Sequence, residues 1–199
     1  MSKPNPLDTY YIREATKEDL PEILEIFNER IRNSTSLFIY DPVPLEDREA
    51  WFNDAKKNGY PVIVAVEKST NKAIAYASYG AFRAKIAYIL TTEISLYIHL
   101  DHHRRGLGRV MLNEMIRIAK EMGLRSVIAS ITSENSASVS LFTNFDFKLV
   151  GTFHDVGQKF GRHLDVDFYE RIFDTPPTAH GVPHFNSFPW GHYVYGGSK

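Results

Sequence analysis

The segment from Asp101 to Arg109 combines three arginines with two closely spaced glycines. It follows an extended apolar run, 92–100, and precedes a run, 110–122, whose apolar residues recur at helical spacing. Glycine lets the backbone approach a ligand closely because it has no Cβ, and a helix N-terminus attracts anions. The pattern therefore predicts a phosphate-binding loop at a strand–helix junction, although a tight turn with a solvated basic edge would show the same residues.

The spacing of these glycines excludes two common phosphate loops. A nucleotide P-loop needs GxxxxGK followed by Ser or Thr, and the sequence has no such run. A dinucleotide fingerprint needs a third glycine, but Gly106-Leu107-Gly108 is followed by Val110 and Met111. The expected ligand is a phosphorylated cofactor of another kind.

Composition narrows the function further. The net charge of -1 gives no general attraction to nucleic acid or acidic membranes. The absence of cysteine excludes a cysteine nucleophile, disulfides and thiolate metal sites. No apolar run reaches the roughly 18 residues of a membrane span, and the polar stretch 1–9 has no signal-like core. We expect a cytoplasmic protein without a metal, nucleic-acid or membrane partner.

Hydrophobic periodicity predicts a mixed order of helices and strands in one domain. Helices are expected at 18–31, after Pro44, at 110–122 and from Asn135 to Phe145. Strands are expected at 10–13, 61–67, 73–80, 88–100, 126–131, 148–156 and 164–173. From Asp174 onward the chain is rich in proline and aromatic residues, so we divide it into a domain, 1–173, and an extension, 174–199. This extension is too aromatic for an ordinary disordered terminus, and we expect it to pack on the domain, on a second subunit or at the mouth of the site.

Several short motifs occur in the order found in one known family. They are Asn28, Ile31, Ser34, Thr35 and Phe38; the run from Phe82 to Tyr88; Thr92-Glu93; the run from Asn135 to Ser138; and the run from Gly157 to Val166. With them the chain resembles the GCN5-related N-acetyltransferases (GNAT), in their phosphinothricin acetyltransferase-like branch, up to about Arg171. The loop His103-Arg104-Arg105-Gly106-Leu107-Gly108 matches the family form Gln/Arg-x-x-Gly-x-Gly/Ala except at His103.

The resemblance implies an α/β fold, with a mixed, mainly antiparallel central sheet that splays open at an acetyl-CoA site and carries helices on both faces. It implies that the pantetheine arm of acetyl-CoA pairs with the strand Leu96-Tyr97-Ile98, where a backbone N–H near Tyr97 or Ile98 would serve as oxyanion donor. The remaining cofactor contacts that it implies are Arg104, Arg105, Gly106, Leu107, Gly108 and Arg109 at the phosphates, and Asn135 and Ser138 at a helix start. Capping of that helix would by itself explain Asn135.

Glu93 is the candidate general base. An alkylammonium must lose a proton before it attacks a thioester, and a carboxylate can accept that proton directly or through water. From its position alone, Glu93 could equally face solvent on an edge strand, but it matches the family's catalytic acidic residue. Phe142 departs from the family, where tyrosine or histidine protonates the leaving thiolate. Either the thiolate leaves unassisted or through water, or another group donates the proton, for which Thr143 and Tyr169 are conceivable.

The acceptor implied by the resemblance is a small amino-acid-like amine of the phosphinothricin or methionine sulfoximine type. Arg83 and Lys85 match a basic pair of that branch, although they could also be solvated loop charges. Aromatic walls are expected from Phe38, Tyr79 and Tyr88. Alternatives are another acceptor, such as a polyamine, an antibiotic amine or a protein N-terminus, or a catalytically weak acyl-CoA-binding protein. The family commonly forms homodimers, and we expect this chain to form one.

Overall fold

Seven strands form one mixed sheet in the computed structural model, which describes residues 5–197. The strands are β1 (Tyr10–Glu14), β2 (Val62–Glu67), β3 (Lys72–Ala81), β4 (Thr91–Ile98), β5 (Ser126–Thr132), β6 (Lys148–Lys159) and β7 (Arg162–Ile172). Their spatial order is β1-β2-β3-β4-β5-β7-β6, and every neighbouring pair is antiparallel except β4 and β5. The predicted mixed, mainly antiparallel sheet is confirmed.

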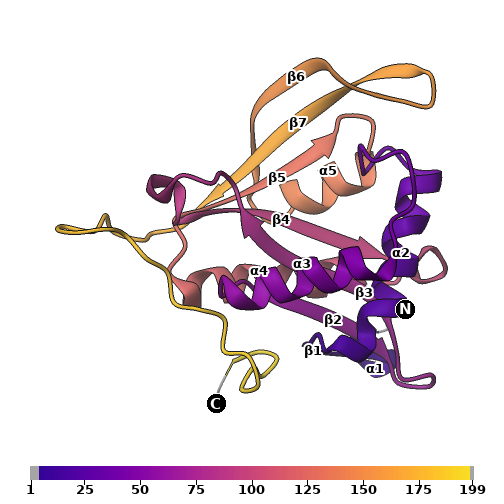
Figure 1. Cartoon of the computed structure of the whole chain (residues 1–199), viewed down its shortest axis with the longest axis horizontal. Helices are drawn as coiled ribbons and strands as arrows, with labels where there is room; N and C mark the ends of the chain where they lie inside the picture. The colour runs from indigo at the N-terminus through magenta and orange to yellow at the C-terminus, as the bar shows by residue number, and fades with distance from the viewer. Residues whose placement is uncertain (1–4, 198–199) are drawn as a thin grey trace.

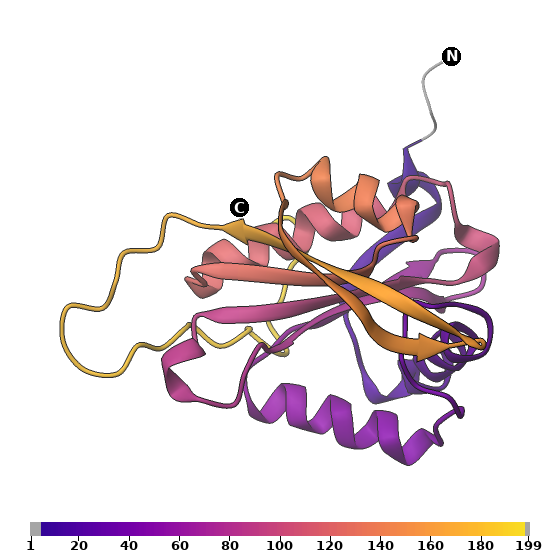
Figure 2. The same cartoon turned by 90° about the horizontal axis from the view of Figure 1, so that it is seen from above.

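Two layers of helices cover this sheet (Figures 1 and 2). On one face lie α2 (Leu20–Asn33) and α3 (Leu45–Lys57), and on the other lie α4 (Leu107–Met122) and α5 (Ser136–Thr143). The short elements are α1 (Pro6–Thr9), η1 (Lys17–Asp19), η2 (Ile86–Tyr88) and η3 (Leu100–His102). Both faces of the central strands are therefore buried, which explains the almost continuous apolar run of β2.

The start of α2 follows from a local signal. Thr16 N donates to Asp19 Oδ2 over 2.8 Å in a capping box, and Asp19 also holds Arg13. The first turn is a 3₁₀ turn, so the α-helix begins at Leu20, two residues later than expected. Ile23 and Phe27 then lie on its buried stripe.

The helix after the glycine loop is amphipathic as predicted. Leu107, Met111, Met115, Ile118 and Met122 are all buried on one side of α4. The methionines fill the core between this helix and the sheet, which is their ordinary role.

The ladder between β4 and β5 is short. Its three pairs are Thr91–Ser126, Thr92–Val127 and Glu93–Ile128, and beyond Glu93 the two parallel strands diverge. On its other side β4 stays paired with β3 down to Ile98. One edge of β4 after Glu93 is therefore left without a neighbouring strand in the described sheet.

The C-terminal extension packs on the domain. After β7 it returns across the molecule (Figure 1), and Phe188 N donates to Gly59 O over 2.9 Å. Phe188 is buried in the core, Trp190 stacks edge-on against Phe52, and the Tyr193 hydroxyl donates to the buried Glu114 of α4 over 2.6 Å. Of the three placements considered for this segment, the structure shows the first.

Candidate active site

A cavity of about 460 Å³ opens where β4 and β5 diverge. Its walls come from β4, β5, the loop before α4 with the first turn of that helix, α5, the last turn of α2 and the segment 34–44 that follows α2. The residues that line it are Arg30, Ser36, Ile94, Ser95, Leu96, Tyr97, Ile98, His103, Arg104, Gly106, Gly108, Arg109, Ala129, Ser130, Ile131, Thr132, Asn135, Ala137, Ser138, Leu141 and Phe142. Most of the residues expected to hold a cofactor are therefore brought together in one place.

The glycine loop forms one end of this cavity. Gly106 directly precedes the first turn of α4. Its φ of 80° is a left-handed conformation, which favours glycine. Arg104 and Arg109 line the cavity, and the N-terminus of the 16-residue α4 lies beside it. Backbone N–H groups, a helix dipole and two guanidinium groups at one end make a site suited to phosphate.

Two residues expected at the phosphates have side chains that lie elsewhere. Arg105 Nη1 donates to the Tyr10 hydroxyl over 3.2 Å, and the Leu107 side chain is buried under α4. Neither side chain lines the cavity, because the turn into α4 directs neighbouring side chains to different sides. The predicted contact of Arg105 and Leu107 with the phosphates therefore rests on their backbone N–H groups.

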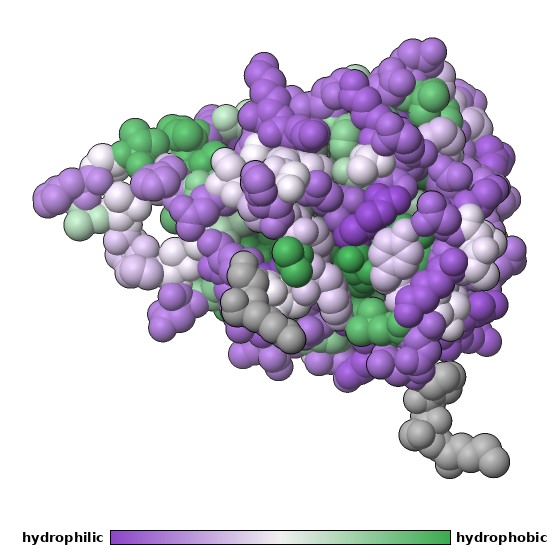
Figure 3. Space-filling model, turned by 90° about the horizontal axis from the view of Figure 1, so that it is seen from below, coloured by the Kyte–Doolittle hydropathy of each residue, from purple (hydrophilic) through white to green (hydrophobic). Residues whose placement is uncertain are grey.

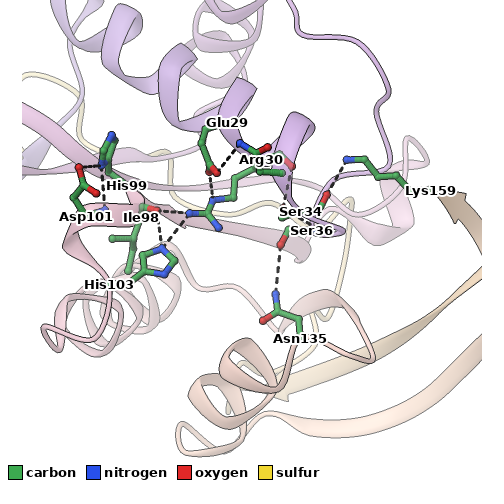
Figure 4. Close-up of polar contacts among 11 residues, drawn as sticks. Glu29, Arg30, Ser34, Ser36, Ile98, His99, Asp101, His103, Asn135 and Lys159 are labelled. Atoms are coloured by element: carbon green, nitrogen blue, oxygen red, sulfur yellow. Dashed lines mark hydrogen bonds and ion pairs between the residues drawn. The ribbon is translucent and has the colours of Figure 1, made fainter. Parts of the chain in front are cut away.

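The end of β4 is held by two basic side chains from outside the strand (Figure 4). Arg30 Nη2 donates to the Ile98 carbonyl over 3.1 Å, and His103 Nε2 lies 3.0 Å from the same oxygen. His103 thus occupies the first position of the loop motif and fixes the loop to the strand that it follows. This contact gives a structural role to the residue that departs from the family pattern.

Side chains from other elements hold the segment 34–44, between α2 and α3, beside the cavity. The buried Lys159 donates to the carbonyls of Ser34 (2.9 Å) and Leu37 (2.6 Å), and burial lowers its pKa. Asn135 Nδ2 reaches Ser36 Oγ over 3.4 Å, and its Oδ1 accepts from Ser138 N, so it caps α5 as expected. Figure 4 shows Lys159 and Asn135 approaching this segment from different sides.

Glu93 lies at the point where the two strands part. It is half-buried, and Ser130 Oγ of β5 donates to its Oε1. Because side chains alternate along a strand, Ser95 and Tyr97 share the face of β4 with Glu93. Burial raises the pKa of Tyr97 to about 12, so its phenol stays protonated around neutral pH.

Phe142 closes the cavity from α5. Its ring is buried and meets Phe147 edge-on, with the ring centroids 5.0 Å apart. Thr143 is exposed, and its Oγ1 donates back to Val139 O over 2.8 Å. Tyr169 is buried in the core, and neither Thr143 nor Tyr169 lines the cavity. The two replacements considered for a thiolate donor are therefore both badly placed.

Tyr79 is not an acceptor wall, which corrects the prediction. Its ring is buried beneath α4, and its hydroxyl donates to Met115 O over 2.7 Å. Gly80 pairs with Glu93, so the adjacent Tyr79 points to the opposite face of the sheet from Glu93. Strand alternation thus separates these two residues.

The other four residues expected at the acceptor lie on exposed loops outside the cavity lining. Arg83, Lys85 and Tyr88 belong to the connection between β3 and β4, and Arg83 stacks on Phe82. Phe38 lines a separate groove of about 550 Å³ beside the β6–β7 hairpin.

Sequence reasoning missed five polar residues that line the cavity outside the glycine loop: Arg30, Ser36, Ser95, Ser130 and Thr132. Thr132 Oγ1 donates to Thr35 O over 2.7 Å, so it also holds the segment after α2. Ser130 and Thr132 lie inside a strand that reads as apolar core, and only the divergence of β4 from β5 exposes them to a cavity.

Comparison with known proteins identifies the family. The family model described as an acetyltransferase (GNAT) domain matches residues 12–167. The chain belongs to the GNAT family. It is 38% identical over 168 residues to an L-methionine sulfoximine/L-methionine sulfone acetyltransferase of Pseudomonas aeruginosa, covering 84% of this chain and 97% of that protein.

Two further matches support this membership. An L-amino acid N-acyltransferase of Escherichia coli is 36% identical over 172 residues, covering 85% of this chain and 99% of its own length. The solved structure of a GNAT superfamily phosphinothricin acetyltransferase from Sinorhizobium meliloti, in complex with acetyl-CoA, superposes with a TM-score of 0.83. It is 30% identical and covers 87% of this acetyltransferase and 95% of its own chain.

Within residues 5–197, no three His, Asp or Glu side chains form a group that could hold a metal ion. Among the helices of the same residues, none has both the length and the apolar character needed to cross a membrane.

Proposed function

We propose that this protein transfers the acetyl group of acetyl-CoA to the amine of a small amino-acid-like acceptor. One observation carries the proposal: the cavity between β4 and β5 has a basic glycine loop at one end and Glu93 beside the point where the strands part. The relatives named for methionine sulfoximine and L-amino acids support this class of acceptor.

The described residues fit the shape and charge of acetyl-CoA. The free edge of β4 from Leu96 to Ile98 offers backbone groups to an extended amide chain, and a backbone N–H near Tyr97 or Ile98 would donate to the thioester oxygen. Arg104 and Arg109 would hold phosphates together with the N–H groups at the start of α4. When bound, acetyl-CoA supplies the reactive thioester.

Glu93 would take a proton from the acceptor ammonium and so free the nitrogen lone pair for attack. Gly80 pairs with Glu93 across β3 and β4, and a Cβ added to Gly80 would meet no atom within 4 Å. The adjacent pair, Ala81–Thr92, is the last of the ladder between β3 and β4. The connection that follows Ala81 contains Arg83 and Lys85. We propose that these two cations bind the anionic end of an acceptor whose amine lies at Glu93.

The site contacts proposed for the acceptor also include Phe38 and Tyr88, which are exposed on loops. Both rings offer apolar area to the side chain of an amino-acid analogue. Their contribution would be to KM for the acceptor, because neither lies among the residues that line the acetyl-CoA cavity.

We also propose that the chain acts in the cytoplasm as a homodimer. The edge strand β6 exposes apolar side chains, namely Leu149, Val150, Phe153 and Val156. The face seen in Figure 3 is instead mainly hydrophilic, with apolar residues in small patches. A second copy seated on β6 would cover its unpaired edge, which an isolated chain leaves open.

The test is release of free thiol from acetyl-CoA by the purified protein. The acceptors to compare are phosphinothricin, methionine sulfoximine, ordinary amino acids, spermidine and an aminoglycoside. Release only with amino acids and their analogues is the expected result. Release only with spermidine or the aminoglycoside would contradict the proposed acceptor, and acetyl-CoA binding without release for any acceptor would favour a catalytically weak acyl-CoA-binding protein.

A further inference from the structure

Ser130 lines the cavity and is hydrogen-bonded to the candidate base, Glu93. Its side chain lines the opening between β4 and β5, two residues after Ile128, which makes the last pair with β4. Its Oγ donates to Glu93 Oε1 across that opening. A hydroxyl has one donor and two acceptor lone pairs, so Ser130 can accept from a protonated Glu93 and donate to a second group at the same time.

The thiolate that leaves in the reaction has to be protonated. Transfer of an acetyl group to an ammonium removes two protons from nitrogen, and the departing thiolate takes up one proton. Phe142 occupies the position where the family has a tyrosine or histidine for this purpose, and a phenyl ring has no proton to give. A protein group that donates this proton in place of water must therefore lie on another element.

Two other hydroxyls of the cavity, those of Thr132 and Tyr97, are less suited to this step. Thr132 Oγ1 donates to Thr35 O, a backbone carbonyl that has no proton to pass on, and within residues 5–197 no hydrogen bond joins the Tyr97 hydroxyl to Glu93. Among the hydroxyl groups that line the cavity in residues 5–197, Ser130 is the one joined to Glu93 by a hydrogen bond.

We propose that Ser130 passes the proton that Glu93 receives from the acceptor amine to the leaving thiolate. This step rests on the proposed function and completes it. Glu93 takes one proton from the ammonium, the amine nitrogen forms a bond to the thioester carbonyl carbon, and the carbon–sulfur bond breaks with its electron pair on sulfur. The Ser130 O–H proton moves to sulfur while the Glu93 proton moves to Ser130 Oγ.

At the end of this step every protein group has the protonation state with which it began. Glu93 returns to the carboxylate, Ser130 is again a neutral hydroxyl, and the second nitrogen proton leaves to water. The products are the N-acetylated acceptor, the free thiol and one proton.

The test combines Ser130→Ala with Phe142→Tyr. Ser130→Ala should lower kcat by about 100-fold, in the range of general acid–base effects, with little change in KM for either substrate. Adding Phe142→Tyr to Ser130→Ala should restore kcat at least about tenfold, because a phenol then supplies the proton. Ser140→Ala, which removes an exposed hydroxyl of α5 outside the cavity, is the matched control.

A second readout needs no acceptor. In a Glu93→Gln background the amide can donate to Ser130 Oγ, which frees the Ser130 O–H to donate to the sulfur of bound CoA. Adding Ser130→Ala to this background should then raise the pKa of the bound thiol by about one unit, measured by ultraviolet absorbance. If this shift appears while the wild-type protein acetylates none of the acceptors, the proposed acceptor class fails and the Ser130 assignment stands.

Two results would overturn the relay. One is a kcat loss in Ser130→Ala that Phe142→Tyr does not restore, together with an unchanged thiol pKa, because Ser130 would then only orient Glu93. The other is a Ser130→Ala variant that keeps the wild-type kcat and thiol pKa.

Discussion

Phe38 lies against the backbone of Gly157 so closely that a Cβ added there would come within 2.0 Å of the Phe38 ring. Any side chain at position 157 must displace this ring, because favourable contact between carbon atoms needs a separation of about 3.5–4.0 Å. We expect Gly157→Ala to move Phe38 and to raise the acceptor KM several-fold, with acetyl-CoA affinity unchanged. Steady-state kinetics check this.

Gly151 on the same strand is the matched control, since a Cβ there would meet no atom within 4 Å. An equal KM in wild type and Gly157→Ala would show that Phe38 lines its groove without contacting the acceptor.

Glu93→Gln keeps the size of the side chain and removes its ability to accept a proton. We expect turnover to fall at least about tenfold while acetyl-CoA affinity stays the same, because the side chain acts on the acceptor. Thiol release and calorimetric titration measure the two quantities. Glu25→Gln changes an exposed carboxylate of α2 and serves as control. Unchanged turnover in Glu93→Gln would remove Glu93 as the base.

The arginines of the glycine loop should differ in their effect on acetyl-CoA binding. Arg104 and Arg109 line the cavity, whereas Arg105 donates to Tyr10. A hydrogen bond to a charged group contributes about 1.5–3 kcal/mol, so Arg104→Ala or Arg109→Ala should weaken binding by roughly 10- to 100-fold. Titrations at low and high salt should show that this loss shrinks as salt rises. A larger loss in Arg105→Ala would reverse the assignment.

The C-terminal extension should stabilise the domain without taking part in binding. Phe188 is 3% exposed, so Phe188→Ala should lower the free energy of unfolding by about 3–5 kcal/mol. Val182→Ala, at a side chain that is 64% exposed, should change it by less than about 0.5 kcal/mol. Denaturant unfolding measures both. Equal stability of Phe188→Ala and wild type would show that domain and extension are independent, as the division at residue 174 implies.

The ion pair between Glu134 and Arg162 makes a pH-dependent contribution to stability. Hydrogen bonds from Arg162 and then Thr35 lower the pKa of Glu134 from its ordinary value of 4.5. The contribution is therefore present above pH 4.5 and is lost as pH falls through the lowered pKa in the folded state. Because the side chains of Arg162 and Glu134 are 54% and 39% exposed, solvent screens the pair, and we expect Glu134→Gln to lower stability only slightly at pH 7.

Unfolding of wild type and Glu134→Gln between neutral and acidic pH tests this dependence. The two stability curves should converge at acidic pH, because protonated Glu134 no longer pairs with Arg162. A difference that stays constant with pH, or that grows as pH falls, would contradict the expected direction.

Local patterns in the sequence were sufficient for much of the fold. The buried stripe of α4, the capping box of Thr16 and Asp19 and the cap of α5 by Asn135 all depend on residues a few positions apart. Hydrogen bonds and packing over such spacings follow from helix geometry, so the sequence by itself determined them. The glycine–arginine loop was predictable for the same reason, because its residues are contiguous.

The tertiary structure decided which of these elements face a common cavity. Whether Ser130 meets Glu93 depends on where β4 and β5 stop pairing, and Tyr79 lies away from Glu93 because of the register between β3 and β4. Phe188 reaches the core only because the extension folds back to Gly59. Each of these contacts joins residues distant in sequence, and their geometry is set by strand register and chain return, which local spacing does not encode.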